Sequence, residues 1–202
     1  VGSLTSTGTG AGGAVTLGRE VVSGAITANG SNGGTVTLGD ECTTGDITSK
    51  PLTGPNAGGV ITISDDCSTG NIDRSGTVAG TTGGIIIIGD RCEVGTISSA
   101  GAAAGAAITI GEGLTSLDIT SQATVSGSGG NLIISHRPVI TGNIDTSGVT
   151  NAGSINIGAN AFINGSVTGA GANGTSGPVF LNDGSHYATL SVPAGTTAGA
   201  IT

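Results

Sequence analysis

The stretch LGDECTTGDIT, residues 38–48, returns as ISDDCSTGNID at 63–73 and as IGDRCEVGTIS at 88–98. Each copy keeps an apolar residue, a charged pair, a cysteine, a glycine and an isoleucine in the same order. The cysteines fall at positions 42, 67 and 92, so the copies are spaced by 25 residues. Self-similarity at a fixed period of this size is the sequence signature of a repeat architecture.

Two columns of apolar residues extend the repeat along the whole chain, both in steps of 21 to 25 residues. Their members are Val15, Val36, Ile61, Ile86, Ile108, Leu132, Ile155, Val179 and Ile201, and Leu4, Ile26, Ile47, Ile72, Ile97, Ile119, Ile144, Val167 and Leu190. Within a copy the apolar residues alternate with polar ones, as in the segment 36–38, which is the periodicity of a strand with one buried face.

A unit of this size cannot bury its apolar face alone, so successive copies must stack and pair as parallel strands. We therefore predict an all-β fold, a single-stranded parallel β-helix (β-solenoid) of about eight to nine coils of roughly 21–25 residues. It occupies residues 1–202 as one domain, with incomplete coils at both ends and no caps. At about 4.8 Å per coil the rod is about 40 Å long.

Composition excludes several classes of partner. The chain has 41 glycines among 202 residues, three aromatic residues and a formal net charge of −8. Nucleic acids and anionic membranes both require a basic face, which five Lys and Arg residues do not supply. No apolar run reaches the length of a membrane span. We expect no cofactor.

The cysteine column shares its spacing with Val21, Leu114, Val139 and Phe162, so Cys42, Cys67 and Cys92 are predicted to form an inward core ladder. A disulfide between neighbouring coils is conceivable, although in-register positions about 4.8 Å apart exceed the usual Cβ separation of about 3.8 Å. Three thiolates in a straight column cannot surround a tetrahedral zinc ion.

A stripe of charged residues precedes each cysteine. Stacked carboxylates repel unless a cation lies between them, so Asp40, Asp65 and Asp90 are a minority candidate for calcium. The alternative is pairing without metal, with Arg19 beside Asp40 and Arg91 beside Asp66. The glycines at 24, 45, 70, 95, 142 and 165 predict a corner where the backbone bends or takes a positive φ.

The outward residues of the main strands include Val60, Ile85, Ile87, Ile133 and Phe180, which predict an apolar face for lateral contact. Only one coil carries a true Thr-x-Thr pair, at 35–37, so an ice-binding array is disfavoured. A carbohydrate-active enzyme is also disfavoured, because such sites need clustered carboxylates or a base in a cleft walled by aromatic residues and long loops.

The GG-x-apolar-x-apolar-G strands and short Gly/Asn turns resemble the β-solenoid repeats of filamentous-haemagglutinin-type adhesins and autotransporter passengers. The resemblance is one of architecture and implies a secreted surface protein with a structural or adhesive role. Surface glycans are then possible partners. It transfers no functional residue.

The two ends of the chain are complementary fractions of one coil. VGSLT at 1–5 matches SGAIT at 23–27, and GAIT at 199–202 matches GAVT at 13–16. Leu4, Thr5, Ala200, Ile201 and Thr202 are therefore predicted to form an axial interface between copies. A head-to-tail contact that does not close builds a filament. We expect a non-enzymatic subunit of an extracellular filament; the alternative is a fragment of a long, secreted, monomeric adhesin.

Overall fold

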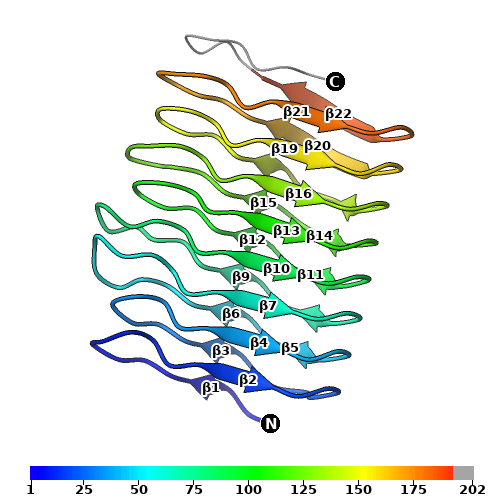
Figure 1. The fold of residues 1–202 in the computed structure, drawn as a ribbon. Helices are drawn as coiled ribbons and strands as arrows, with labels where there is room; N and C mark the ends of the chain where they lie inside the picture. Colours follow the sequence, from blue (N-terminus) through cyan, green and yellow to red (C-terminus); the bar gives the residue numbers. More distant parts are fainter. Residues whose placement is uncertain (193–202) are drawn as a thin grey trace.

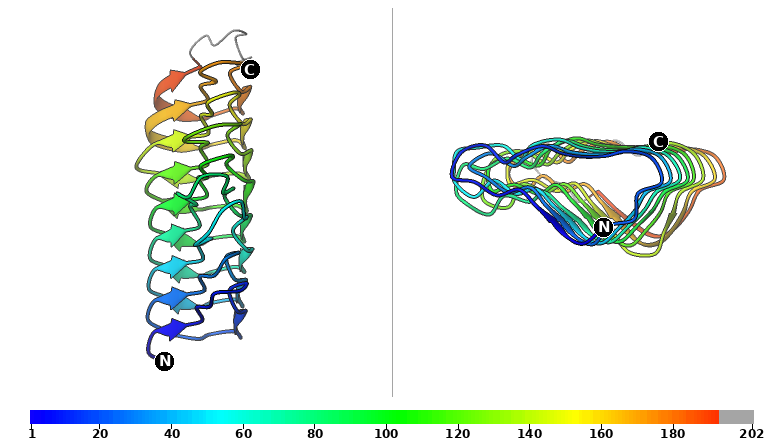
Figure 2. Two further views of the ribbon diagram at one scale, coloured as in Figure 1. Left: turned by 90° about the vertical axis from the view of Figure 1, so that its left-hand side faces the viewer. Right: turned by 90° about the horizontal axis from the view of Figure 1, so that it is seen from below.

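The computed structural model describes residues 1–192 as a stack of coils that climb along one axis (Figure 1). All regular structure in this part of the chain is β-strand, and every strand pair is parallel. Seen along the axis, successive coils superimpose in a flat, elongated outline (Figure 2). The predicted parallel β-solenoid is confirmed.

Each coil contributes one strand to an eight-stranded sheet. Its strands are β2 (Val15–Leu17), β4 (Val36–Leu38), β7 (Ile61–Ile63), β10 (Ile86–Ile88), β13 (Ile108–Ile110), β16 (Leu132–Ile134), β19 (Ile155–Ile157) and β21 (Val179–Leu181). The register pairs Val15 with Val36, Val36 with Ile61, and so on to Val179. This is the first column read from the sequence; its last member, Ile201, lies outside the described residues.

A fourteen-stranded sheet holds two ladders that merge at β20 (Phe162–Thr168), followed by β22 (His186–Ser191). The β6 ladder comprises β1 (Leu4–Thr5), β3 (Ile26–Thr27), β6 (Ile47–Thr48), β9 (Ile72–Asp73), β12 (Ile97–Ser98), β15 (Ile119–Thr120) and β18 (Ile144–Asp145). The β5 ladder comprises β5 (Thr43–Thr44), β8 (Ser68–Thr69), β11 (Glu93–Val94), β14 (Thr115–Ser116) and β17 (Val139–Ile140). The β6 ladder follows the second predicted column from Leu4 to Leu190.

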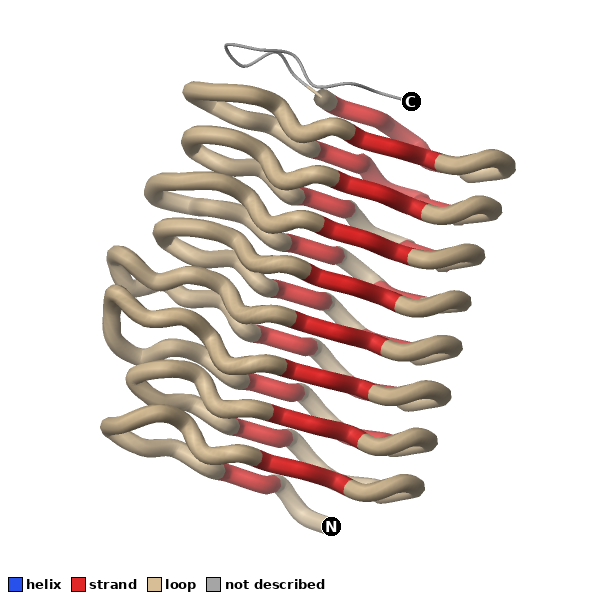
Figure 3. Tube along the Cα trace, in the orientation of Figure 1, coloured by secondary structure: helices blue, strands red, loops and turns tan. Residues whose placement is uncertain are grey.

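Alternation along the short strands places β-branched residues inside. In β10 the side chains of Ile86 and Ile88 are buried while Ile87 between them is exposed, and the same alternation recurs from coil to coil. The strands align in vertical columns, whereas the other side of each coil is irregular loop (Figure 3). Stacked Ile, Leu and Val thus form a continuous core.

The cysteine column differs from the sequence prediction at two positions. Val139 and Phe162 are 40% and 51% exposed and pair with Thr115 and with each other on the outer face. Ala161 is buried in the column instead. The β17–β18 connection contains one residue more than the equivalent connections of earlier coils, and β20 contains one extra residue at its register shift between Ile163 and Ser166, so a count taken backwards from the next isoleucine or valine slips by one.

The predicted glycine corner is confirmed as a bend at Gly24, Gly45, Gly70, Gly95 and Gly142, whereas Gly165 lies within β20, and none of the six has the positive φ that was the alternative. Left-handed conformations occur at the preceding corner, next to the cysteines, once per coil. They belong to Glu20, Glu41, Asp66, Arg91, Gly113, Arg137, Asn160 and Gly184. In six of these eight coils a side chain other than glycine therefore occupies a conformation that L-residues rarely adopt.

Candidate functional site

The first coil presents an open sheet edge. Strands β1 and β2 are terminal members of their sheets and have strand neighbours on one side only. Leu4, Val15 and Leu17 are only partly buried, although their counterparts one coil higher, such as Val36 and Leu38, are fully buried. Thr5 is exposed. The predicted partners Ala200, Ile201 and Thr202 lie outside the described residues.

The outer face of the eight-stranded sheet brings together only part of the predicted lateral patch. Val60 lies beside Ile85, and Ile85 and Ile87 flank the buried Ile86 at the start of β10, so these side chains cluster over two adjacent coils. Ile133 and Phe180 are exposed but separated from the cluster. Thr109 lies between Ile87 and Ile133, and Asn156 lies between Ile133 and Phe180.

The charged ridge comprises residues 19–20, 40–41, 65–66, 90–91, 112 and 136–137. Its carboxylates cap backbone N–H groups of the next coil: Oδ1 of Asp65 accepts from Asp90 N at 2.8 Å, and Oδ1 of Asp90 accepts from Glu112 N at 2.7 Å. Within residues 1–192 there is no group of three His, Cys, Asp or Glu side chains arranged to hold a metal ion. The geometry gives Asp65 and Asp90 a role in coil stacking.

Ion pairs cross the ridge between coils. Arg91 donates to both carboxylate oxygens of Asp66 at 2.7 Å, as the sequence suggested, and this hydrogen bonding lowers the pKa of Asp66. Arg19 pairs with Glu41 rather than with the predicted Asp40, because Glu41 extends from the left-handed position of the coil above. Further pairs join Arg137 to Glu112 and Lys50 to Asp73.

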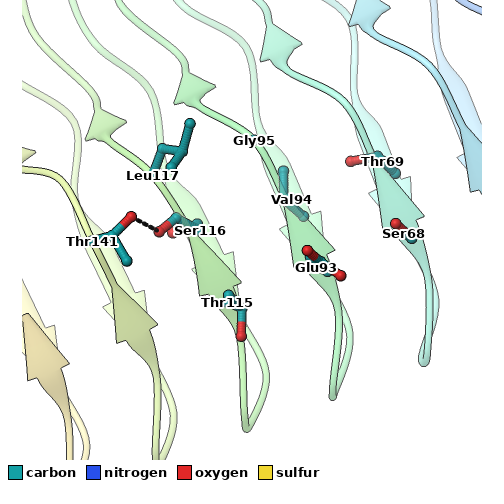
Figure 4. Close-up of a pocket in the computed structure, with 9 residues that line it drawn as sticks. All are labelled: Ser68, Thr69, Glu93, Val94, Gly95, Thr115, Ser116, Leu117 and Thr141. Carbon is teal, nitrogen blue, oxygen red and sulfur yellow. Dashed lines mark hydrogen bonds between the residues drawn. The ribbon is translucent and has the colours of Figure 1, made fainter.

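An open groove of about 380 Å³ crosses four coils on the outer side of the β5 ladder (Figure 4). Its lining residues are Ser68, Thr69, Glu93, Val94, Gly95, Thr115, Ser116, Leu117 and Thr141. Glu93 is the ionisable side chain among them, so the groove does not offer a paired acid and base. The sequence analysis did not predict this groove. The feature that could have indicated it is Leu117, which stands where neighbouring coils carry a corner glycine.

The three cysteines are free, buried and stacked in one column. The Cys42 backbone N–H lies 3.4 Å from Cys67 Sγ, so the thiols are close to the backbone of the neighbouring coil. Burial raises the pKa of Cys67 and raises that of Cys92 to about 11. The thiols of Cys67 and Cys92 are therefore protonated at neutral pH and poorly nucleophilic.

The sequence prediction missed a buried cation. Arg74 is fully buried in a column whose neighbouring members are Ser49 and Ser99. Its Nη1 donates to the Ile85 carbonyl at 2.7 Å, but Nη2 has no partner within the described residues. Burial lowers the pKa of Arg74 to about 10. The available signal was an arginine in a column that carries Ser49, Ser99, Ser121 and Thr146 in neighbouring coils.

Comparison with family models, curated proteins and solved structures gives no match to this chain. No helix long and apolar enough to cross a bilayer occurs in residues 1–192. Inferences about function therefore rest on the geometry of the coil edge, the faces and the core.

Proposed function

We propose that this chain is a structural, non-enzymatic subunit of an extracellular filament that grows by axial stacking of β-solenoid coils. The observation that carries the proposal is the unbroken parallel register from coil to coil, because a coil edge such as that of β1 and β2 can pair with an added coil in the same way. The extracellular location rests on the resemblance to the solenoid repeats of adhesins and autotransporter passengers.

The edge has the two properties that axial addition requires. Strands β1 and β2 offer backbone N–H and C=O groups that a further coil would pair, which is the general liability of an open sheet edge. The same coil leaves Leu4, Val15 and Leu17 partly exposed. Completing their burial would contribute about 1 kcal/mol each, roughly half the value for a side chain fully buried from water.

The register provides specificity. Each internal coil places its apolar residues directly over those of the coil below, as Ile26 lies over Leu4 and Val36 over Val15. An added coil that preserves this register continues the buried columns, while a slip of one residue exposes them to solvent. We expect copies to join end to end with the ladder unbroken.

Electron microscopy and sedimentation of the chain 1–202 test the proposal. We expect straight filaments with an axial repeat of about 40 Å, from eight to nine coils at about 4.8 Å. Leu4→Lys should leave folded monomers, because it places an unpaired charge in the junction. Thr16→Lys is the matched control: it lies in the same coil but points outward and should still polymerise.

Other outcomes would overturn the proposal. Wild-type chains that remain monomeric at high concentration, or that aggregate without an axial repeat, would favour a segment of a long monomeric adhesin. Filaments formed equally well by Leu4→Lys would place the junction elsewhere.

Ile87→Lys reports on lateral bundling, and we expect it to thin bundles without shortening single filaments.

A further inference from the structure

The three thiols repeat with the same geometry from coil to coil. Cys42 Sγ donates to Gly18 O at 3.0 Å, Cys67 Sγ to Gly39 O at 3.2 Å, and Cys92 Sγ to Ser64 O at 3.1 Å. These acceptors are equivalent, since each directly follows a strand of the eight-stranded sheet. The register of the residues next to the cysteines is also unbroken, with Thr43 over Ser68 over Glu93.

Equivalent contacts mean that successive Sγ atoms are related by the same step as successive coils, about 4.7–4.9 Å. A metal ion midway between two such sulfurs would form two collinear bonds of about 2.4 Å. This length is close to the metal–thiolate distance of about 2.3 Å known for zinc. The column cannot surround a tetrahedral ion, but it presents adjacent thiols at the span of a linear S–metal–S unit.

We infer that the adjacent pairs Cys42/Cys67 and Cys67/Cys92 form a linear two-coordinate site for a soft monovalent cation of the Cu(I) and Ag(I) class. Thiolate ligands favour such ions. Binding breaks two S–H bonds, forms two S–metal bonds and releases two protons, with no change of oxidation state. The product carries one negative charge, and the Cys42 N–H that points at Cys67 Sγ helps to stabilise it.

The surroundings suit a dry site. Leu114 is fully buried one coil beyond Cys92, and Val21 occupies the column one coil before Cys42, so apolar residues close both ends. Carboxylate side chains, which hard cations prefer, do not occur among the buried residues that stack with these cysteines in the described part of the chain. Because each thiol must lose its proton to bind the metal ion, affinity should rise with pH.

Silver titration of the folded, reduced chain tests the inference, in chloride-free buffer without oxygen or added thiol. We expect one Ag(I) bound per chain by native mass spectrometry and about two protons released per ion. The strand signal in circular dichroism should persist, and X-ray absorption should show two sulfur neighbours in line. Three ions per chain, one for each thiol, would mean ordinary thiol capture and would overturn the site.

Single substitutions provide the sharper test, because Cys67 belongs to both pairs. Cys67→Ser leaves Cys42 and Cys92 two coils apart, about 9.6 Å, which one ion cannot bridge. We expect its affinity for Ag(I) to fall at least 100-fold, while Cys42→Ser and Cys92→Ser each keep one pair and change affinity only a few-fold. Equal losses in all three variants would exclude a linear pair.

Folding of the variants is checked by their strand spectra. If Cys67→Ser does not fold, Cys67→Val takes its place, since Val21 already occupies this column. Binding that requires loss of the strand signal in the wild-type chain would also overturn the inference, because unfolded thiols capture silver without any defined geometry.

Discussion

Each coil turns at two neighbouring corners that obey different rules. At the first, on the charged ridge, one residue per coil adopts a left-handed conformation, and in most coils it is charged rather than glycine. At the second, between the β5 and β6 ladders, glycine recurs without a positive φ. The corner that needs unusual backbone therefore tolerates large side chains, whereas the corner with ordinary backbone carries glycine in most coils, with Leu117 as an exception.

Space explains the second corner. A Cβ atom on Gly70 would lie 2.3 Å from Asp46 Oδ1, and one on Gly95 would lie 2.6 Å from Asn71 Oδ1. These oxygens accept the backbone N–H of the next coil, as Asp46 does from Asn71 at 2.7 Å. Leu117 fits at the same corner because the coil below carries Thr96, which does not extend a carboxyl or carboxamide group upward.

Exposure explains the first corner. Side chains on the ridge extend into solvent and pair with charges on adjacent coils, as Arg91 does with Asp66. The left-handed backbone costs about 1–2 kcal/mol for an L-residue, a penalty that a stacked coil can sustain. The two corners therefore separate steric from conformational selection of glycine, and substitutions can measure each.

The largest expected loss of stability comes from a substitution in the core column beside both corners, and it sets the upper limit against which the corner substitutions are compared. Ile86→Asp buries an unpaired charge between Ile61 and Ile108 and should abolish folding. Ile87→Asp is the matched control on the exposed side of the same strand and should fold. Circular dichroism and thermal unfolding compare the two; a cooperative wild-type transition for Ile86→Asp would contradict the inward assignment.

The steric corner should respond next most strongly. Gly70→Leu forces the side chain against Asp46 and displaces its hydrogen bond, at an expected cost of about 2–4 kcal/mol in unfolding free energy. Urea denaturation measures the loss. The double variant Asp46→Thr/Gly70→Leu reproduces the natural Thr96 and Leu117 arrangement and should recover most of it. Additive losses in the double-mutant cycle would show that the Asp46 carboxylate oxygen below Gly70 does not select glycine.

The sequence predicted the features that repeat and missed those that depend on one coil. Alternation and period fixed the strands and the isoleucine columns, because burial imposes the same residue type on every coil. The phase of Val139 was wrong because one added residue in a corner is invisible to a column count. The glycine column predicted the corner but not its cause, because a recurrent glycine does not reveal whether φ or a neighbouring oxygen requires it.

Arg74 breaks the pattern of its column in one coil only, and its replacement tests whether such an exception lowers the stability of the fold. Arg74→Met removes the buried charge at similar length and should stabilise the chain by about 1–3 kcal/mol at pH 7. The folded-state pKa of Arg74 is lowered to about 10, so above that pH the folded chain releases a proton that the unfolded chain retains. Above that pH the unfolding free energy of the wild-type chain therefore rises, and the difference in stability between Arg74→Met and the wild type becomes smaller. Urea denaturation at pH 7, 9 and 11 checks this. For the control Arg137→Met, at an exposed position, the difference in unfolding free energy from the wild type should not shrink between pH 9 and 11.

The left-handed corner on the charged ridge should give the smallest effect on stability. It also allows the conformational penalty to be measured without a steric clash. Gly113 is left-handed with φ of 71°, and a Cβ there would approach no atom closer than 3.7 Å, so Gly113→Ala meets a conformational penalty without a clash. We expect a loss of about 1 kcal/mol in unfolding free energy. Gly18→Ala is the matched control, because a Cβ there has open space and the backbone is not left-handed; it should change stability by less than about 0.5 kcal/mol. Equal effects at the two positions would mean that the backbone conformation of the ridge does not limit stability, and that the charged residues at this corner are strain-free.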